Sequence, residues 1–209
     1  MLKIPVTLSD NELLRLMMDG DSRAFSEIYR RHHLSIYRFA RLMSDSKTIA
    51  EDVTQEVFMV LIREVTRFDP ERGSLRAFLY GIARNYVKRF QKRDRFHISL
   101  ADESENHEDK DIIQLIAADN PLGEFMRNET IKLVRKAVLN LPLRYREVVV
   151  LCDFQEMSYA EAADVLGCPI GTINSRLHRA HSLLLKKLRR VMVKYDAPVS
   201  DEQIMRCFA

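Results

Sequence analysis

The sequence predicts an all-α fold of two small helical domains joined by a flexible linker, the second with a helix-turn-helix. Glycine and proline occur only 6 times each in 209 residues, while leucine, arginine, alanine and glutamate are plentiful, which favours helices over a sheet. Helix-start signals recur along the chain, and no segment shows sustained alternation of apolar and polar residues. A polar stretch between two helical segments predicts the linker.

The first domain, residues 1–93, is expected to hold four helices. The predicted cap residues are Ser9 with Glu12, Asp21, Thr48 with Glu51, and Ser74. Apolar residues at helical spacing predict the buried faces of the third and fourth helices: Val53, Val57, Val60, Leu61, Leu75, Phe78 or Leu79, Ile82 and Tyr86.

Residues 94–128 are predicted to form the linker. They are polar and rich in aspartate and glutamate, and they include Asn120-Pro121 and Gly123. A short helix is expected at 112–117. Residues 129–195 form the predicted second domain, and 196–209 a C-terminal tail.

A helix-turn-helix is predicted in the second domain. Ser158 and Glu161 have the spacing of a capping box, and Gly167 can adopt the positive φ that ends the helix. The apolar face of this short helix is predicted to be Ala160, Ala163 and Leu166. Pro169 lies near the start of a longer helix, whose predicted buried face is Ile173, Leu177, Ala180 and Leu184. A helical hairpin that binds no DNA remains the alternative at this point.

The distribution of charge is more informative than the net charge of +3. One basic block runs from Arg84 to Arg95, an acidic run occupies 101–111, and 171–190 contains no acidic residue. Two separate basic patches suggest two contacts with one anionic polymer, although solvated helix faces would give the same composition.

No signal of catalysis or membrane insertion is found in the sequence. No P-loop, HExxH motif or pair of catalytic carboxylates is present, so we expect no catalytic residue, cofactor or metal site. The three cysteines, Cys152, Cys168 and Cys207, fit a reducing cytosol, and no apolar run is long enough for a bilayer. His32-His33 is expected to be a surface pair, and the protein is expected to be cytoplasmic.

Several segments resemble extracytoplasmic-function (ECF) sigma factors of the sigma-70 family. LPLRYREVVVL (141–151) and SYAEAADVLGCPIGTINSRLHRA (158–180) resemble region four, and SRAFSEIYRRHHLSIYRFARLM (22–43) and AEDVTQEVFMVLI (50–62) resemble region two. The chain departs from the family's frequent residues at Glu156 (glycine), Ala162 (isoleucine), Phe78 (tryptophan) and Arg89 (aspartate).

The resemblance implies three binding surfaces. The −35 element would be read by Thr172, Ser175, Arg176 and Arg179, on the side of their helix away from its predicted core. The −10 element would be contacted by Arg84, Asn85, Lys88, Arg89 and Lys92, with the preceding loop able to hold an unstacked base. Core RNA polymerase would bind Asp52, Gln55, Glu56 and Met59, an acidic stripe with a methionine that suits a basic helical partner.

The expected function is that of a sigma factor that binds core RNA polymerase and directs promoter-specific initiation. Its partners would be the core polymerase and double-stranded and melted promoter DNA, and the resemblance makes an anti-sigma factor a further candidate. The alternatives are a helix-turn-helix transcriptional regulator with an N-terminal helical sensor or dimerisation domain, and a helical adaptor that binds only protein.

Overall fold

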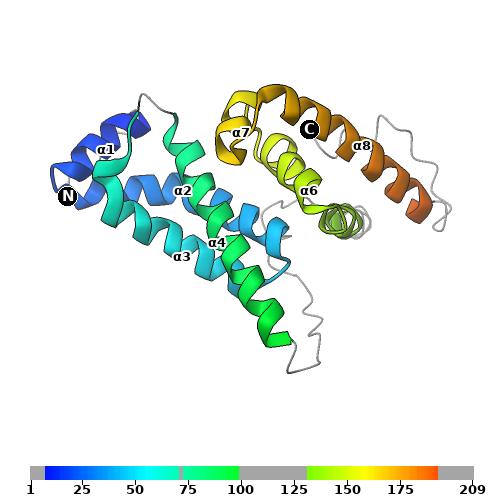
Figure 1. Cartoon of the computed structure of the whole chain (residues 1–209). Coiled ribbons are helices and arrows are strands. Elements are labelled where there is room, and N and C mark those ends of the chain that lie inside the picture. Colours follow the sequence, from blue (N-terminus) through cyan, green and yellow to red (C-terminus); the bar gives the residue numbers. More distant parts are fainter. Residues whose placement is uncertain (1–7, 71–72, 99–130, 193–209) are drawn as a thin grey trace, which may run out of the picture.

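The computed structural model describes residues 8–70, 73–98 and 131–192, and every regular element in these ranges is helical (Figure 1). The first module contains α1 (Asp10–Met18), α2 (Ser22–Ser44), α3 (Lys47–Glu64), the 3₁₀ turn η1 (Val65–Arg67) and α4 (Leu75–Ile98). The second module contains the helical residues 131–139, α6 (Leu143–Val149), the π-helix η3 (Val150–Phe154), α7 (Tyr159–Leu166) and α8 (Ile170–Met192). None of the described helices is both long and apolar enough to cross a membrane.

The predicted helix starts of the first module are confirmed with one exception. The capping box of Ser9 and Glu12 forms, and the side chain of Asp21 accepts a hydrogen bond at the start of α2. Ser74 accepts a 3.1 Å hydrogen bond from the backbone N–H of Ala77. The start predicted at Thr48 is wrong, because the helix begins earlier: Ser46 caps α3 by accepting from the N–H of Ile49.

The cores of α3 and α4 differ slightly from the predicted faces. Val60 is only half-buried, and Phe58 and Thr54 are buried in its place. On α4, Leu79 rather than Phe78 enters the core, and the buried face is completed by Leu75, Tyr80, Ala83 and Val87. Ile82 and Tyr86 are half-buried, because the buried face of α4 is rotated around the helix from the predicted face, towards Tyr80, Ala83 and Val87.

Helix α4 continues to Ile98, past the predicted linker start at residue 94. The rest of the predicted linker, its short helix at 112–117 and the tail 196–209 lie outside the described residues.

The second module contains the predicted helix-turn-helix. Both bonds of the Ser158–Glu161 capping box form, and Gly167 ends α7 with φ 64°. Ala160 is exposed, contrary to the prediction, because α7 buries the neighbouring positions Ala162 and Val165 instead. Glu156, just before α7, has φ 50°, a conformation that favours glycine, which explains why glycine suits this position.

The two modules pack against each other in the structure (Figure 1). Helix α4 contacts α7, and α2 contacts η3. The buried hydroxyl of Tyr80 donates a 2.7 Å hydrogen bond to Oε1 of Gln155. At the other end of the contact, Arg146 donates to the carbonyl of Met43 at 3.0 Å.

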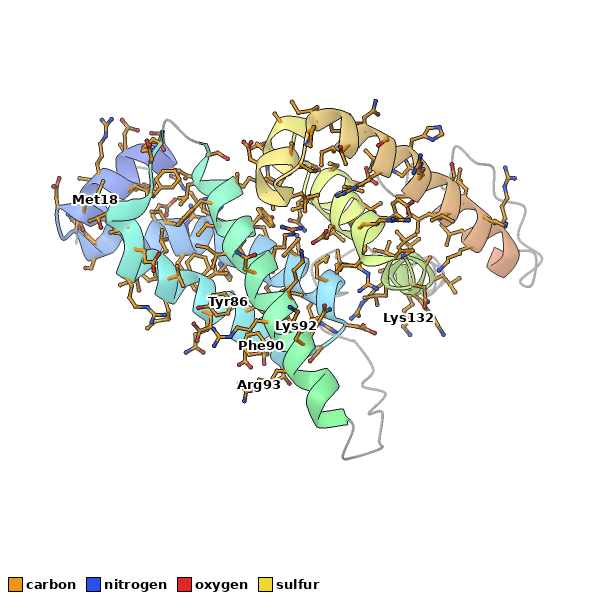
Figure 2. The ribbon with its side chains drawn as sticks, in the orientation of Figure 1. Met18, Tyr86, Phe90, Lys92, Arg93 and Lys132 are labelled. Atoms are coloured by element: carbon orange, nitrogen blue, oxygen red, sulfur yellow. The ribbon has the colours of Figure 1, made fainter. Side chains whose placement is uncertain are left out.

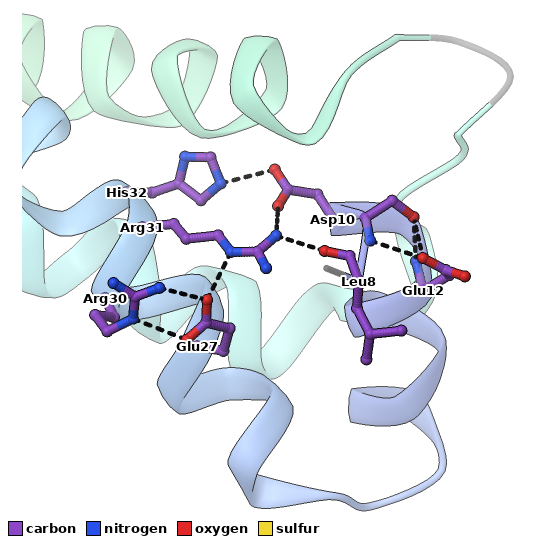
Figure 3. Close-up of polar contacts among 8 residues, drawn as sticks. Leu8, Asp10, Glu12, Glu27, Arg30, Arg31 and His32 are labelled. Carbon is purple, nitrogen blue, oxygen red and sulfur yellow. Dashed lines mark hydrogen bonds and ion pairs between the residues drawn. The ribbon is translucent and has the colours of Figure 1, made fainter. Parts of the chain in front are cut away.

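A polar network fixes α1 onto α2 (Figure 3). The carboxylate of Asp10 accepts from Nη1 of Arg31 at 3.0 Å and lies 2.8 Å from Nε2 of His32. His32 is therefore a partly buried partner of Asp10 and not the simple surface histidine that the sequence suggested. Its hydrogen bond holds the pKa of Asp10 below the ordinary value of 3.8.

We predict that Asp10→Asn lowers the free energy of unfolding by about 1–2 kcal/mol at pH 7, because charged hydrogen bonds to two partners are lost. A depressed folded-state pKa contributes stability above the unfolded pKa, and this contribution is lost as the pH falls through the folded value. The difference from the wild type should therefore shrink below about pH 4. Urea denaturation at several pH values measures it. Asp19→Asn, at an exposed carboxylate in the same region, is the control, and an equal loss there would contradict the assignment.

Candidate nucleic-acid interface

Helix α8 has one buried face and one exposed basic face. Ile173, Leu177, Ala180 and Leu184 are all buried, as predicted, and Leu188 extends the row by one turn. These residues hold α8 against α6 and α7 along its length. The opposite face is left for a partner.

The predicted −35 residues lie on this opposite face near the start of α8. Ser175 and Arg179 are exposed, and Thr172 and Arg176 are half-exposed. The hydroxyl of Ser175 donates to the backbone carbonyl of Thr172 at 3.1 Å. A helix N-terminus with short hydroxyls and arginines one turn further on can approach phosphates and guanine edges.

A contact that the sequence did not reveal fixes α8 to the rest of the module. Nε2 of His181 lies 2.7 Å from Oδ2 of Asp153, which is carried by the π-helix η3. A π-helix is a local bulge that redirects side chains, and such bulges occur often at functional sites. The sequence carries no signal of this pair, because the two residues are 28 positions apart and meet only through tertiary packing.

The predicted −10 residues of α4 divide into two groups. Asn85, Arg89 and Lys92 are exposed, and Lys92 lies towards the C-terminal end of α4 (Figure 2). Arg84 and Lys88 instead face the second module, where both pair with the carboxylate of Glu147, at 2.6 Å and 3.1 Å.

A cavity of about 380 Å³ lies beside the start of α4. Its apolar walls come from Phe68, Phe78 and Ile82, and Asn85 adds a polar group. The rings of Phe68 and Phe78 are 5.4 Å apart. An aromatic-lined cavity next to a basic helix can hold an unstacked base.

The predicted polymerase-binding residues lie on the outer side of α3. Asp52, Gln55 and Met59 are exposed, and Glu56 is half-exposed and lies 3.7 Å from Arg63. Gln55 and Met59 line a groove of about 540 Å³ between α2 and α3. The other lining residues are mainly apolar and include Phe25, Tyr29, Phe58 and Ile62. An apolar groove flanked by carboxylates suits a helical partner with basic residues.

Comparison with known families covers both modules. Residues 28–96 match the family model of Sigma-70 region 2, and residues 131–184 match that of Sigma-70, region 4. The chain is 31% identical over 179 residues to the ECF RNA polymerase sigma factor SigW of Bacillus subtilis, which covers 84% of this chain and 95% of the relative. It is 28% identical over 191 residues to the ECF RNA polymerase sigma-E factor of Haemophilus influenzae, with 88% and 98% covered.

Two solved structures resemble the fold. CnrH in complex with the cytosolic domain of CnrY matches with a TM-score of 0.63 and 26% identity, covering 87% of this chain and 97% of that one. The sigma factor RpoE in complex with the anti-sigma factor NepR, from Bartonella quintana, matches with a TM-score of 0.62 and 27% identity, covering 79% and 96%.

A chain with both sigma region 2 and sigma region 4 has the architecture of a sigma factor, the subunit that directs RNA polymerase to promoters. This chain belongs to the extracytoplasmic-function group of the sigma-70 family. The alternative of a helix-turn-helix regulator with a separate sensor domain is not favoured, because the first module matches region 2.

We predict that Gly167→Ala destabilises the second module by about 1 kcal/mol, since alanine is strained at the positive φ that ends α7. The matched control is Gly81→Ala in α4, where an added Cβ would meet nothing within 4 Å. Alanine there should stabilise by about 0.5–1 kcal/mol, because it is the better helix former. Thermal denaturation compares the two, and effects of the same sign would contradict the assigned turn.

Proposed function

We propose that the protein binds core RNA polymerase through α3 and directs initiation by reading the −35 element with α8 and the −10 element with α4. The protein would act in the cytoplasm with the polymerase and would carry out no catalysis of its own. The observation that carries this proposal is the exposed basic face of α8, held rigidly by a buried apolar row. Such a face would be a preorganised surface for the major groove.

The −35 contact would use the first turns of α8. Arg176 and Arg179 are one turn apart and would reach base edges, while Thr172 and Ser175 lie nearest the helix start, where phosphate binds well. Lys186 lies further along the helix and is exposed, so it would contact the DNA backbone at most.

The −10 contact would use the exposed residues of α4 and the cavity at its start. Asn85 belongs to both, because it lies on α4 and lines the cavity. Arg84, Lys88, Arg89 and Lys92 would contact the phosphates of the melted strand. Opening the duplex exchanges base stacking for contacts with the protein, so no nucleotide hydrolysis is required.

We also propose that an anti-sigma factor holds this protein in its inactive state. The RpoE structure, similar over 79% of this chain, was solved with the anti-sigma factor NepR. The groove between α2 and α3, with its exposed Met59 and Ile62, would be a surface for which the polymerase and such a factor compete.

We predict that the purified protein gives specific transcripts when it is added to sigma-free core polymerase and a library of promoter fragments. Met59→Ala should weaken core binding about tenfold, because an exposed apolar anchor is removed from the groove. Met18→Ala in α1 is the matched control, since the two methionines are 47% (Met18) and 44% (Met59) exposed. Absence of both core binding and promoter-dependent transcripts would reject the proposal, and a palindrome-binding dimer would favour the helix-turn-helix regulator.

We predict that Arg176→Ala weakens binding to the −35 element at least about tenfold, because a bidentate contact to guanine contributes about 1–3 kcal/mol of discrimination. Core affinity should be unchanged. Lys186→Ala on the same helix is the control and should weaken binding to all sequences slightly and equally. Loss of −35 and core binding together would show that Arg176 has a structural role instead. Fluorescence anisotropy with duplex DNA and a core-binding assay measure the two affinities.

A further inference from the structure

One face of α4 is covered by the second module. Tyr80, Arg84 and Lys88 follow one another at intervals of four residues, so their side chains form a row along one side of the helix. Tyr80 donates to Gln155 at 2.7 Å, and Arg84 and Lys88 both reach Glu147. The row that carries two of the proposed −10 contacts is therefore occupied by the protein itself.

The carboxylate of Glu147 is the centre of this contact. Glu147 is only 4% exposed, although it is charged. Nε of Arg84 lies 2.6 Å from its Oε1, and Nζ of Lys88 lies 3.1 Å from the same atom. Charge-assisted hydrogen bonds in a sheltered site are stronger than neutral ones, and a buried carboxylate without its cations would be strongly disfavoured.

The second module also reaches the cavity at the start of α4. Asp164 and Val165 of α7 line it together with the residues of the first module. Ser74 at the cavity donates to Glu161 of α7 at 3.1 Å. Asp164 adds a second carboxylate to that of Asp69 at this cavity, so the packed arrangement increases the repulsion of phosphate there.

The other proposed surfaces stay accessible in the same arrangement. Ser175 and Arg179 of α8 are exposed, and so are Asp52 and Met59 of α3. The contact between the modules thus covers Arg84 and Lys88 of the proposed −10 surface and leaves Asn85, Arg89 and Lys92 exposed. The −35 and polymerase surfaces stay open.

We propose that the second module is an intramolecular latch, in which Glu147 holds Arg84 and Lys88 and withholds these two residues of the −10 surface from DNA in the free protein. The inference rests on the proposed function, because only that function makes Arg84 and Lys88 contacts with DNA. The latch itself is a contact between the two modules. A partner that binds the modules only when they are apart favours the open form by its difference in affinity. Single-stranded DNA binds α4 with an apparent affinity reduced by the fraction of molecules that are closed.

The test uses the full-length free protein and Glu147→Arg, which places a third cation against Arg84 and Lys88. Small-angle X-ray scattering should show a larger radius of gyration than that of the wild type. Affinity for a fluorescent single-stranded oligonucleotide of mixed sequence should rise about tenfold, since the competent fraction increases. The matched control is Glu156→Arg, which makes the same change of charge at an exposed residue of the same module.

The outcomes are decisive in both directions. A larger radius and tighter binding for Glu147→Arg, but not for Glu156→Arg, support the latch. Equal radii and equal affinities of the two variants overturn it. If circular dichroism shows that Glu147→Arg has lost helix, Glu147→Gln, which keeps the side-chain shape, is compared with Glu156→Gln by the same criteria.

Failure of the latch and failure of the proposed function give different results. Neither the radius of gyration nor the binding of the oligonucleotide involves the polymerase. If the wild type initiates normally but Glu147→Arg keeps the wild-type radius of gyration and affinity, the latch alone is rejected. A wild type that does not initiate with core polymerase rejects the sigma function, whatever the radius shows.

Discussion

The arrangement of the two modules depends on how one buried carboxylate is neutralised. Removing a carboxylate from water costs far more than a single apolar contact returns, so Glu147 must find cations wherever it is buried. Arg84 and Lys88 lie on successive turns of α4 and supply these cations. The two ion pairs together fix both the position of α4 along its axis and its rotation relative to α6. The hydrogen bond from Tyr80 to Gln155 adds a directional contact between the modules. Burial raises the pKa of Tyr80, so its hydroxyl stays protonated and can donate.

The exposure of the basic face of α8 depends on a different principle. Helix α8 exposes its basic face because its other face, from Ile173 to Leu188, is buried in the core. The His181–Asp153 pair adds a polar contact to η3 near the middle of the helix. The side chains proposed to read DNA are therefore carried on a rigid support, which reduces the entropy lost when they bind.

The sequence was most informative about local structure. Capping boxes at Ser9 and Ser158 and the glycine turn at Gly167 depend on residues within a few positions of each other, so their signals are complete in the sequence. The cap at Thr48 failed because Ser46 offers the same chemistry two residues earlier. The pairs Arg84–Glu147 and His181–Asp153 were not predicted, since they join residues far apart in the chain and depend on tertiary packing.

The proposed sharing of Arg84 and Lys88 between Glu147 and DNA would make the protein sensitive to ionic strength in one direction. Ions in solution weaken contacts with DNA phosphates steeply, because binding releases condensed counterions. They screen a sheltered ion pair much less, and the side chain of Glu147 is only 5% exposed. A rise in ionic strength would thus shift these cations from nucleic acid towards the internal carboxylate, so the salt around the protein would itself set the balance between the two.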